Sequence, residues 1–291
     1  MLLKEDSRSD QIDKFGRTPL AYLKFMGVRH NDSDMTSLQM EIAKEFMGAW
    51  KSLDAKDDDG MTALHHIVEF LNDENIERYY LKRDREANSA AANTADKAGR
   101  TPLHIAVLAE RGEVAASVAS VLLRHGAERS TKDSSGMTPL MLACKTGQAV
   151  VATVLLDYTG VDAERDHGGK TALHYAVEPE KFSSGQDLAA LMENAKEDSN
   201  VRFSSAQAPP DETTHLASMD IIDSCDHDGR TPLHEAILAD NATVARALLG
   251  HGADVKLKDR FGRNSLHHAA ESNQIGNPPA EESLIFNVFN A

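Results

Sequence analysis

The sequence has few cysteines, few aromatic residues and a shortage of positive charge. Only 2 of its 291 residues are cysteine, which argues against a disulfide framework and favours a reducing compartment. Aromatic residues make up 5% of the chain, which favours short helices packed through Ala, Leu and Val over one deep aromatic core. The formal net charge is −15, and this excess opposes general binding to nucleic acid.

Long apolar segments are also missing. No apolar run approaches the roughly 20 residues that a membrane-spanning helix needs. The first ten residues, MLLKEDSRSD, contain no apolar region of the kind found in signal peptides. We therefore expect a protein of the cytoplasm or nucleus that has no membrane partner.

Motifs for catalysis, metal binding and cofactor binding are absent as well. There is no G-x-S-x-G, and Gly168-Gly169-Lys170 lacks the spacing of a phosphate-binding loop. His234-Glu235 is not followed by the second histidine of H-E-x-x-H, because Leu238 stands there. No C-x-x-C pair exists for zinc, and neither cysteine has a base placed by spacing. We expect no enzyme activity, no metal and no cofactor.

What the sequence does have is one repeated pattern, Asp-x-x-Gly followed by Thr-Pro-Leu-His or a variant. The clearest copy spans residues 226–259. Thr231 before Pro232 predicts a helix N-cap with proline at the first helical position, where its missing N–H costs nothing. Apolar residues then follow at helical spacing, at Leu233, Ala236 and Ile237. A second apolar stripe around 244–248 predicts another helix, which Gly252 ends.

Seven copies of the turn occur along the chain. Their glycines are Gly16, Gly60, Gly99, Gly136, Gly169, Gly229 and Gly262. Gly136 and Gly169 are 33 residues apart, and so are Gly229 and Gly262. The spacings between the other neighbouring glycines are longer. The longer spacings indicate insertions within a regular array.

The Thr-Pro-Leu-His motif, the Leu-Leu-x-x-Gly-Ala-Asp-Val tail at 248–255 and the period of about 33 residues resemble the ankyrin repeat. This resemblance implies an all-α ankyrin-repeat solenoid of about seven stacked helix–turn–helix units over residues 13–291, after a flexible segment 1–12. Each unit is too small to bury its apolar faces alone, so it must stack on its neighbours. The family's histidines hydrogen-bond locally and to the next unit, which gives a structural role to His65, His104, His174, His234 and His267.

Several stretches depart from the regular pattern. Residues 196–218 are rich in Ser, Asp, Glu, Ala and Pro, and we expect an extruded acidic loop there. In the second unit we expect a charged helix near 74–87 and a flexible return over 89–96, in which Asn93 is a structural turn residue. Longer second helices are expected at 35–50 in the first repeat and at 280–289 in the last repeat.

In the ankyrin family the turn tips and first helices form a concave binding surface. The matching candidates here are Phe15, Arg17, Met61, Lys97, Arg100, Met137, His167, Lys170, His227, Arg230, Phe261 and Arg263. Stacking would align their cations into a partly basic row that suits an acidic or phosphorylated protein segment. Alternatively, these cations pair with aspartates of neighbouring units and only stabilise the stack.

The resemblance implies a non-catalytic scaffold or adaptor that binds a partner protein on a preorganised concave surface. One alternative is the substrate-targeting module of a larger enzyme, such as a ubiquitin ligase, kinase or acyltransferase, whose further domains lie in a longer parent chain. Another is an ankyrin-type transcriptional regulator of the inhibitor-of-κB or fungal cell-cycle-box type.

Overall fold

The structure is a computed structural model, and it describes residues 14, 56–70, 85–109, 112–157, 164–177 and 221–276. The chain divides into two compact units, Met1–Ser134 and Ser135–Ala291, which we describe one at a time. The predictions for segment 1–12, the helices at 35–50 and 280–289 and the loop 196–218 fall outside the described residues. Within those residues the regular secondary structure is helical, with one isolated antiparallel bridge between Lys258 and Asn264.

The first unit contains four described helices. They are α2 (Ala63–Phe70), α4 (Arg85–Ala92), α5 (Pro102–Leu108) and α6 (Glu113–Arg124). α5 packs against both α2 and α6. The leucines Leu64, Leu103 and Leu122 fill this core and are completely buried. The sequence therefore stacks the first helices of consecutive turns and covers them with a second helix, as the apolar stripes predict.

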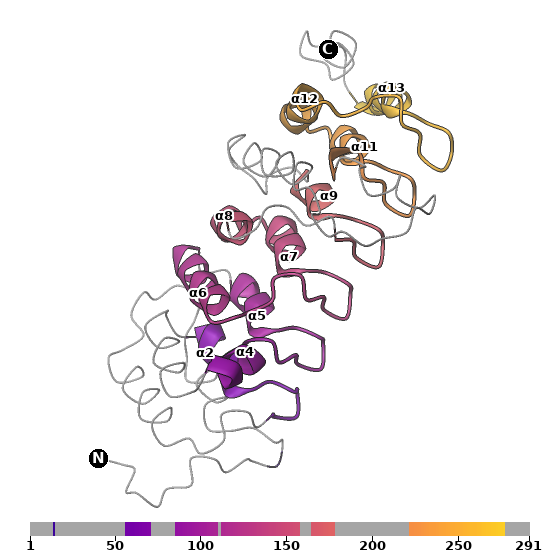
Figure 1. The fold of residues 1–291 in the computed structure, drawn as a ribbon. Coiled ribbons are helices and arrows are strands. Elements are labelled where there is room, and N and C mark those ends of the chain that lie inside the picture. Colours follow the sequence, from indigo (N-terminus) through magenta and orange to yellow (C-terminus); the bar gives the residue numbers. More distant parts are fainter. Residues whose placement is uncertain are drawn as a thin grey trace, which may run out of the picture. The chain divides into compact units, whose positions relative to one another are not determined.

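The second unit repeats this arrangement. Its elements are α7 (Pro139–Thr146), α8 (Ala149–Asp157), α9 (Ala172–Ala176), the 3-10 helix η4 (Ile221–Asp223), α11 (Pro232–Leu238), α12 (Ala242–Gly250) and α13 (Ser265–Gly276). α7 packs on α8 and α9, while α11 packs on α12 and α13 (Figure 1). The predicted stripe of α11 is buried at Leu233, Ala236 and Ile237. Cys144 on α7 is also fully buried.

The first helix of a repeat begins directly after the threonine predicted as its N-cap. Thr231 has an extended backbone, and its hydroxyl accepts a hydrogen bond from the backbone N–H of His234 at 3.4 Å. His234 reciprocates, because its Nδ1 accepts from the Thr231 N–H at 3.0 Å. Pro232 occupies the first helical position. This reciprocal cap satisfies two groups that a helix start leaves without helical partners.

Consecutive turns in each unit are joined by one backbone hydrogen bond. In the first unit, Lys97 N–H donates to the Asp59 carbonyl at 2.9 Å and Ser134 N–H to Ala98 at 2.8 Å. The second unit has the same bonds from His167 to Ser135, from His227 to Gly168 and from Arg260 to Asp228 at 3.3, 2.9 and 2.9 Å. These bonds fix the turns at one register within each unit.

The stretch of chain at the end of the second repeat differs from the prediction. Residues 89–92 were expected to form a flexible return, but they are helical and belong to α4. Ala91 and Ala92 are 3% and 0% exposed. Alanine has the highest helix propensity and buries its methyl group without loss of side-chain entropy, so the helix continues until Asn93.

Candidate partner-binding surface

Aspartates shape most of the described turns. In five of them, one carboxylate oxygen, Oδ1, accepts hydrogen bonds from the backbone N–H groups two and four residues later, at 2.8–2.9 Å. These aspartates are Asp57, Asp96, Asp166, Asp226 and Asp259. Because both bonds lie within the turn, the backbone at the tip is held in one conformation before any partner arrives.

The second oxygen of several turn aspartates takes a side-chain donor. Arg100 donates to Asp96 at 2.8 Å, and Arg263 donates to Asp259 at 2.9 Å. Elsewhere the donor comes from the following helix, as with His66 on Asp57 at 2.9 Å. Burial would raise the pKa of Asp259, but the bonds from Arg263 and the backbone N–H groups outweigh burial and lower that pKa. Arg100 and Arg263 therefore stabilise their own turns.

The family histidines join neighbouring turns in two places. Nδ1 of His65 accepts from the Thr62 N–H at 3.1 Å, so its Nε2 carries the proton and donates to the Arg100 carbonyl at 3.1 Å. His174 makes the equivalent bond to Arg230 at 3.0 Å. Burial lowers the pKa of His65 to about 4, which keeps its ring neutral at pH 7. The predicted structural role is confirmed for both residues.

The last two histidines of this series behave differently. His234 packs edge-on against the ring of His268 on α13, with centroids 5.1 Å apart. His267 is exposed and bonds to Asn264 within its own repeat. His234 therefore meets the next repeat through the ring of His268, whereas the described bonds of His267 stay within its own repeat.

The candidate turn residues fall into distinct classes of exposure. Phe15 and Arg17 lie outside the described residues. The exposed candidates are Lys97, His167, His227 and Phe261, and the half-buried ones are Met61, Arg100, Lys170, Arg230 and Arg263. Met137 is 4% exposed and therefore presents little surface to a partner. Its apolar side chain packs inward beneath Lys145, whose Nζ is 3.9 Å from the Met137 sulfur.

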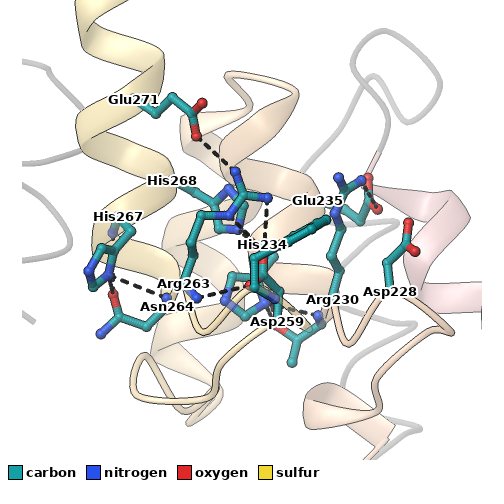
Figure 2. Close-up of polar contacts among 12 residues, drawn as sticks. Asp228, Arg230, His234, Glu235, Asp259, Arg263, Asn264, His267, His268 and Glu271 are labelled. Carbon is teal, nitrogen blue, oxygen red and sulfur yellow. Dashed lines mark hydrogen bonds and ion pairs between the residues drawn. The ribbon is translucent and has the colours of Figure 1, made fainter.

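The cations of the second unit are partly engaged within the chain (Figure 2). Arg263 reaches Glu271 at 3.2 Å as well as Asp259, and Arg260 pairs with Asp228 of the preceding turn at 2.7 Å. The guanidinium groups of Arg260 and Arg263 lie 4.7 and 5.0 Å from the ring centroid of Phe261, which is 62% exposed. This tip therefore presents an aromatic face flanked by two positive charges.

Two residues of this surface were missed from the sequence. Lys145 lies on α7 and Tyr175 lies on α9, and the Lys145 Nζ is 5.5 Å from the centroid of the Tyr175 ring. The available signal was their place on the first helices, because Tyr175 directly follows His174 of the repeated motif. That signal gives position along a helix but not the approach of side chains from two repeats.

The described residues offer little for covalent or metal chemistry. Burial raises the pKa of the Cys144 thiol to about 12, so it is not a thiolate nucleophile at neutral pH. No cluster of three His, Cys, Asp or Glu side chains suited to a metal ion is found in this part of the chain. Nor does any described helix have the length and apolar character to cross a membrane.

Comparison with known proteins finds similar repeats in a protein family and in several individual proteins. The model of the family described as ankyrin repeats matches residues 35–128, 109–201 and 208–279. Human B-cell lymphoma 3 protein is 30% identical over 190 residues, and human Rabankyrin-5 is 27% identical over 247. These alignments cover 65% and 78% of this chain, but only 37% and 20% of those proteins.

Among solved structures, the ankyrin repeat domain of Bcl-3, a member of the IkappaB protein family, superposes with a TM-score of 0.60 at 18% identity. The alignment covers 94% of this chain and 99% of that domain. The three family-model matches do not establish the number of repeats, so the count of seven stays a prediction. The family-model match over most of the sequence shows that the chain belongs to the ankyrin repeat family.

Proposed function

We propose that this chain is a non-catalytic scaffold or adaptor that binds a partner protein on its turn tips and first helices. Ankyrin repeat proteins are in general interaction modules without catalytic activity. The observation that carries the proposal is the hydrogen-bond ladder between turns, which aligns exposed side chains in each unit. A surface whose backbone is already fixed loses little conformational entropy when a partner binds.

The exposed tips supply suitable contact residues. Phe261 combines 62% exposure with two flanking guanidinium groups. Aromatic residues and arginines carry much of the binding energy at protein interfaces. Lys97, His167 and His227 are also exposed, and each directly follows the turn aspartate, the place that Arg260 holds in the last described turn. We assign the partner an acidic or phosphorylated segment, and we place the interaction in the cytoplasm or nucleus.

The test is affinity capture with the intact chain, read by mass spectrometry, followed by two substitutions. Phe261→Ala and Lys97→Glu should each reduce recovery of the captured partner while the thermal midpoint stays within about 2 °C of the parent. We avoid Arg263 because it donates to the buried Asp259, so its loss would also weaken the fold.

Val150→Ala is the matched control, since Val150 is an exposed apolar residue of α8, outside the turns and first helices. It should leave recovery of the partner unchanged. Partner recovery that survives both turn substitutions, or that falls equally with Val150→Ala, would contradict the proposed surface.

A second candidate is a transcriptional regulator of the inhibitor-of-κB type. It is favoured by the similarity to B-cell lymphoma 3 protein and to the solved domain of Bcl-3, a member of the IkappaB family. This role requires the protein to reach the nucleus. Imaging of the tagged chain in its native cells tests it, and exclusion from the nucleus under all conditions would remove this candidate.

A further inference from the structure

We infer that Glu235 on α11 binds a lysine or arginine side chain of the partner segment, and that Arg230 then leaves Glu235 and turns back to Asp226. The inference rests on the proposed function and adds one basic contact to the acidic segment proposed for the turn tips. All three residues belong to the second unit.

In two other turns an arginine pairs with the aspartate four residues before it. Nε of Arg100 donates to Asp96 Oδ2 at 2.8 Å, and Nε of Arg263 donates to Asp259 Oδ2 at 2.9 Å. The Nη2 atoms of these arginines lie 2.7 and 2.9 Å from the same oxygens. Two short contacts to one carboxylate make a strong pair, and the two aspartate side chains are only 1% and 0% exposed.

Arg230 holds the same place relative to Asp226 but does not make this pair. The turn itself is unchanged, because Asp226 Oδ1 accepts two backbone N–H groups at 2.8 and 2.9 Å, as in the other turns. The guanidinium of Arg230 instead reaches Glu235, whose Oε1 lies 3.5 Å from Nη1. The Nε of Arg230 is buried and has no hydrogen-bond partner among the described residues. Figure 2 shows Arg230 directed toward Glu235, and Arg263 close to Asp259.

Glu235 is the residue that makes this turn different. In three other repeats the residue at its position, nine places after the turn aspartate, donates a hydrogen bond to that aspartate; these donors are His66, Tyr175 and His268. An ionised glutamate cannot donate, so Asp226, which is 8% exposed, does not receive this bond. The charge of Glu235 also attracts Arg230 away from Asp226. A departure from a consistent local pattern is expected where a function requires it.

The chain on its own gives Glu235 two long contacts. Lys170 Nζ lies 3.7 Å from Glu235 Oε1, and Arg230 lies 3.5 Å from the same atom. The Glu235 side chain is 18% exposed, so losing Arg230 without a replacement would leave its charge poorly solvated. The return of Arg230 to Asp226 is therefore favourable only when another cation reaches Glu235.

A basic side chain of a partner completes the pairs in this group. It takes the place of Arg230 at Glu235, while Arg230 gains the contacts that Arg100 and Arg263 make in their own turns. An acidic side chain at the same place would have to displace Glu235, and it would leave Asp226 without its arginine. These contacts therefore favour lysine or arginine as the occupant.

The first test uses a fluorescein-labelled peptide of alternating Lys and Ser, about twelve residues long, titrated with the intact chain and followed by anisotropy. Glu235→Gln should weaken binding of this peptide at least about tenfold, because it removes the acceptor of a half-buried charge pair. The matched control is Asp240→Asn, which removes the same charge from an exposed aspartate just after α11. Asparagine also tolerates the positive φ of this position, and the control should change the affinity by less than about threefold.

A second measurement follows Arg230 itself. Its side-chain Nε–H signal in a two-dimensional proton–nitrogen NMR spectrum is assigned through its loss in Arg230→Lys. This signal should become protected from solvent exchange when the Lys-Ser peptide is added. The same protection should occur without peptide in Glu235→Gln, since Glu235 no longer draws Arg230 from Asp226. The Arg263 signal, whose Nε–H is already bonded to Asp259, should stay protected throughout and serves as the reference.

Three results would each overturn the inference. They are failure of the Lys-Ser peptide to bind, equal effects of Glu235→Gln and Asp240→Asn on its affinity, and an Arg230 signal that neither the peptide nor Glu235→Gln changes. The proposed function would still stand in those cases if the captured partner depends on Phe261 and Lys97.

Discussion

At the scale of single residues, Gly229 and Gly262 have nearly the same backbone angle, with φ of +75° and +77°, but different surroundings. A Cβ on Gly229 would lie 2.8 Å from the backbone nitrogen of Arg260, whereas a Cβ on Gly262 would meet nothing within 4 Å. The two positions therefore separate the conformational need for glycine from the need for space between stacked turns.

We predict that Gly262→Ala lowers the free energy of unfolding by about 1–2 kcal/mol, the cost of a left-handed conformation in an L-residue. Gly229→Ala should lose at least about 1 kcal/mol more, because its new methyl group overlaps the next turn. Urea denaturation of the two variants measures the difference. Equal losses would show that the turns separate at little cost and that the ladder does not constrain them.

A second residue-scale prediction concerns pH and His65. Burial lowers the pKa of this histidine to about 4 in the folded chain, while the unfolded value is about 6.5. The unfolded state therefore binds a proton that the folded state excludes, so stability is complete above pH 6.5 and falls as the pH drops toward 4. The slope is about 1.4 kcal/mol per pH unit for one such group.

His65→Gln should lower stability at pH 7.5, since it disrupts the bonds to Thr62 and Arg100. The variant should also lose less free energy of unfolding than the parent between pH 6.5 and 4.5, which urea denaturation at several pH values measures. His174, whose pKa burial also lowers, still contributes to the remaining slope. An unchanged pH dependence in this variant would mean that His65 does not titrate differently in the two states.

At the scale of elements, Asn93 joins the end of α4 to the loop after α6. Its Nδ2 donates to the carbonyls of Ser89 and Gly126 at 3.0 and 2.8 Å, and its Oδ1 accepts from the Glu128 N–H at 2.7 Å. The expected structural role of this asparagine is confirmed by these bonds. One side chain thus fixes both the last turn of a helix and the chain return of the next repeat.

Asn93→Ala should therefore destabilise the first unit by about 1–3 kcal/mol, since it removes three hydrogen bonds that are each worth about 0.5–1.5 kcal/mol. The local readout is hydrogen exchange at the Glu128 amide, which should accelerate more than exchange in α5. Asn93→Asp keeps the acceptor for Glu128 and removes only the two donors, so it should protect that amide better than Asn93→Ala. Equal exchange at the Glu128 amide in both variants would show that the bond to Asn93 Oδ1 does not protect this amide.

The comparison of sequence and structure is clearest for the helices. The Thr-Pro pair and the apolar spacing predicted the start and buried face of α11. Prediction failed at 89–92, where alanine-rich sequence was interpreted as a flexible return although Ala91 and Ala92 are buried. Small residues give a weak periodic signal, so their burial depends on neighbours that a linear pattern does not reveal.

For the candidate site, sequence spacing was sufficient to place the turn tips but not to resolve their contacts. It correctly indicated exposed tips such as Lys97 and Phe261. It did not indicate the burial of Met137, which follows from packing between helices. Lys145 and Tyr175 are 30 residues apart and meet only because α7 and α9 stack, so no short motif could identify them.

At the scale of the molecule, a repeat array passes stabilisation mainly between neighbours. Leu233 lies on α11 and is fully buried, so Leu233→Ala should cost about 2–5 kcal/mol through the cavity it leaves. Because α11 packs on α12 and α13, hydrogen exchange should accelerate most in these three helices and least in α7 within the second unit. Val150→Ala, on the exposed face of α8, should leave exchange unchanged and serves as the control. Equal acceleration from α7 to α13 would show instead that the second unit unfolds as one cooperative block, and the nearest-neighbour description would then be wrong for it.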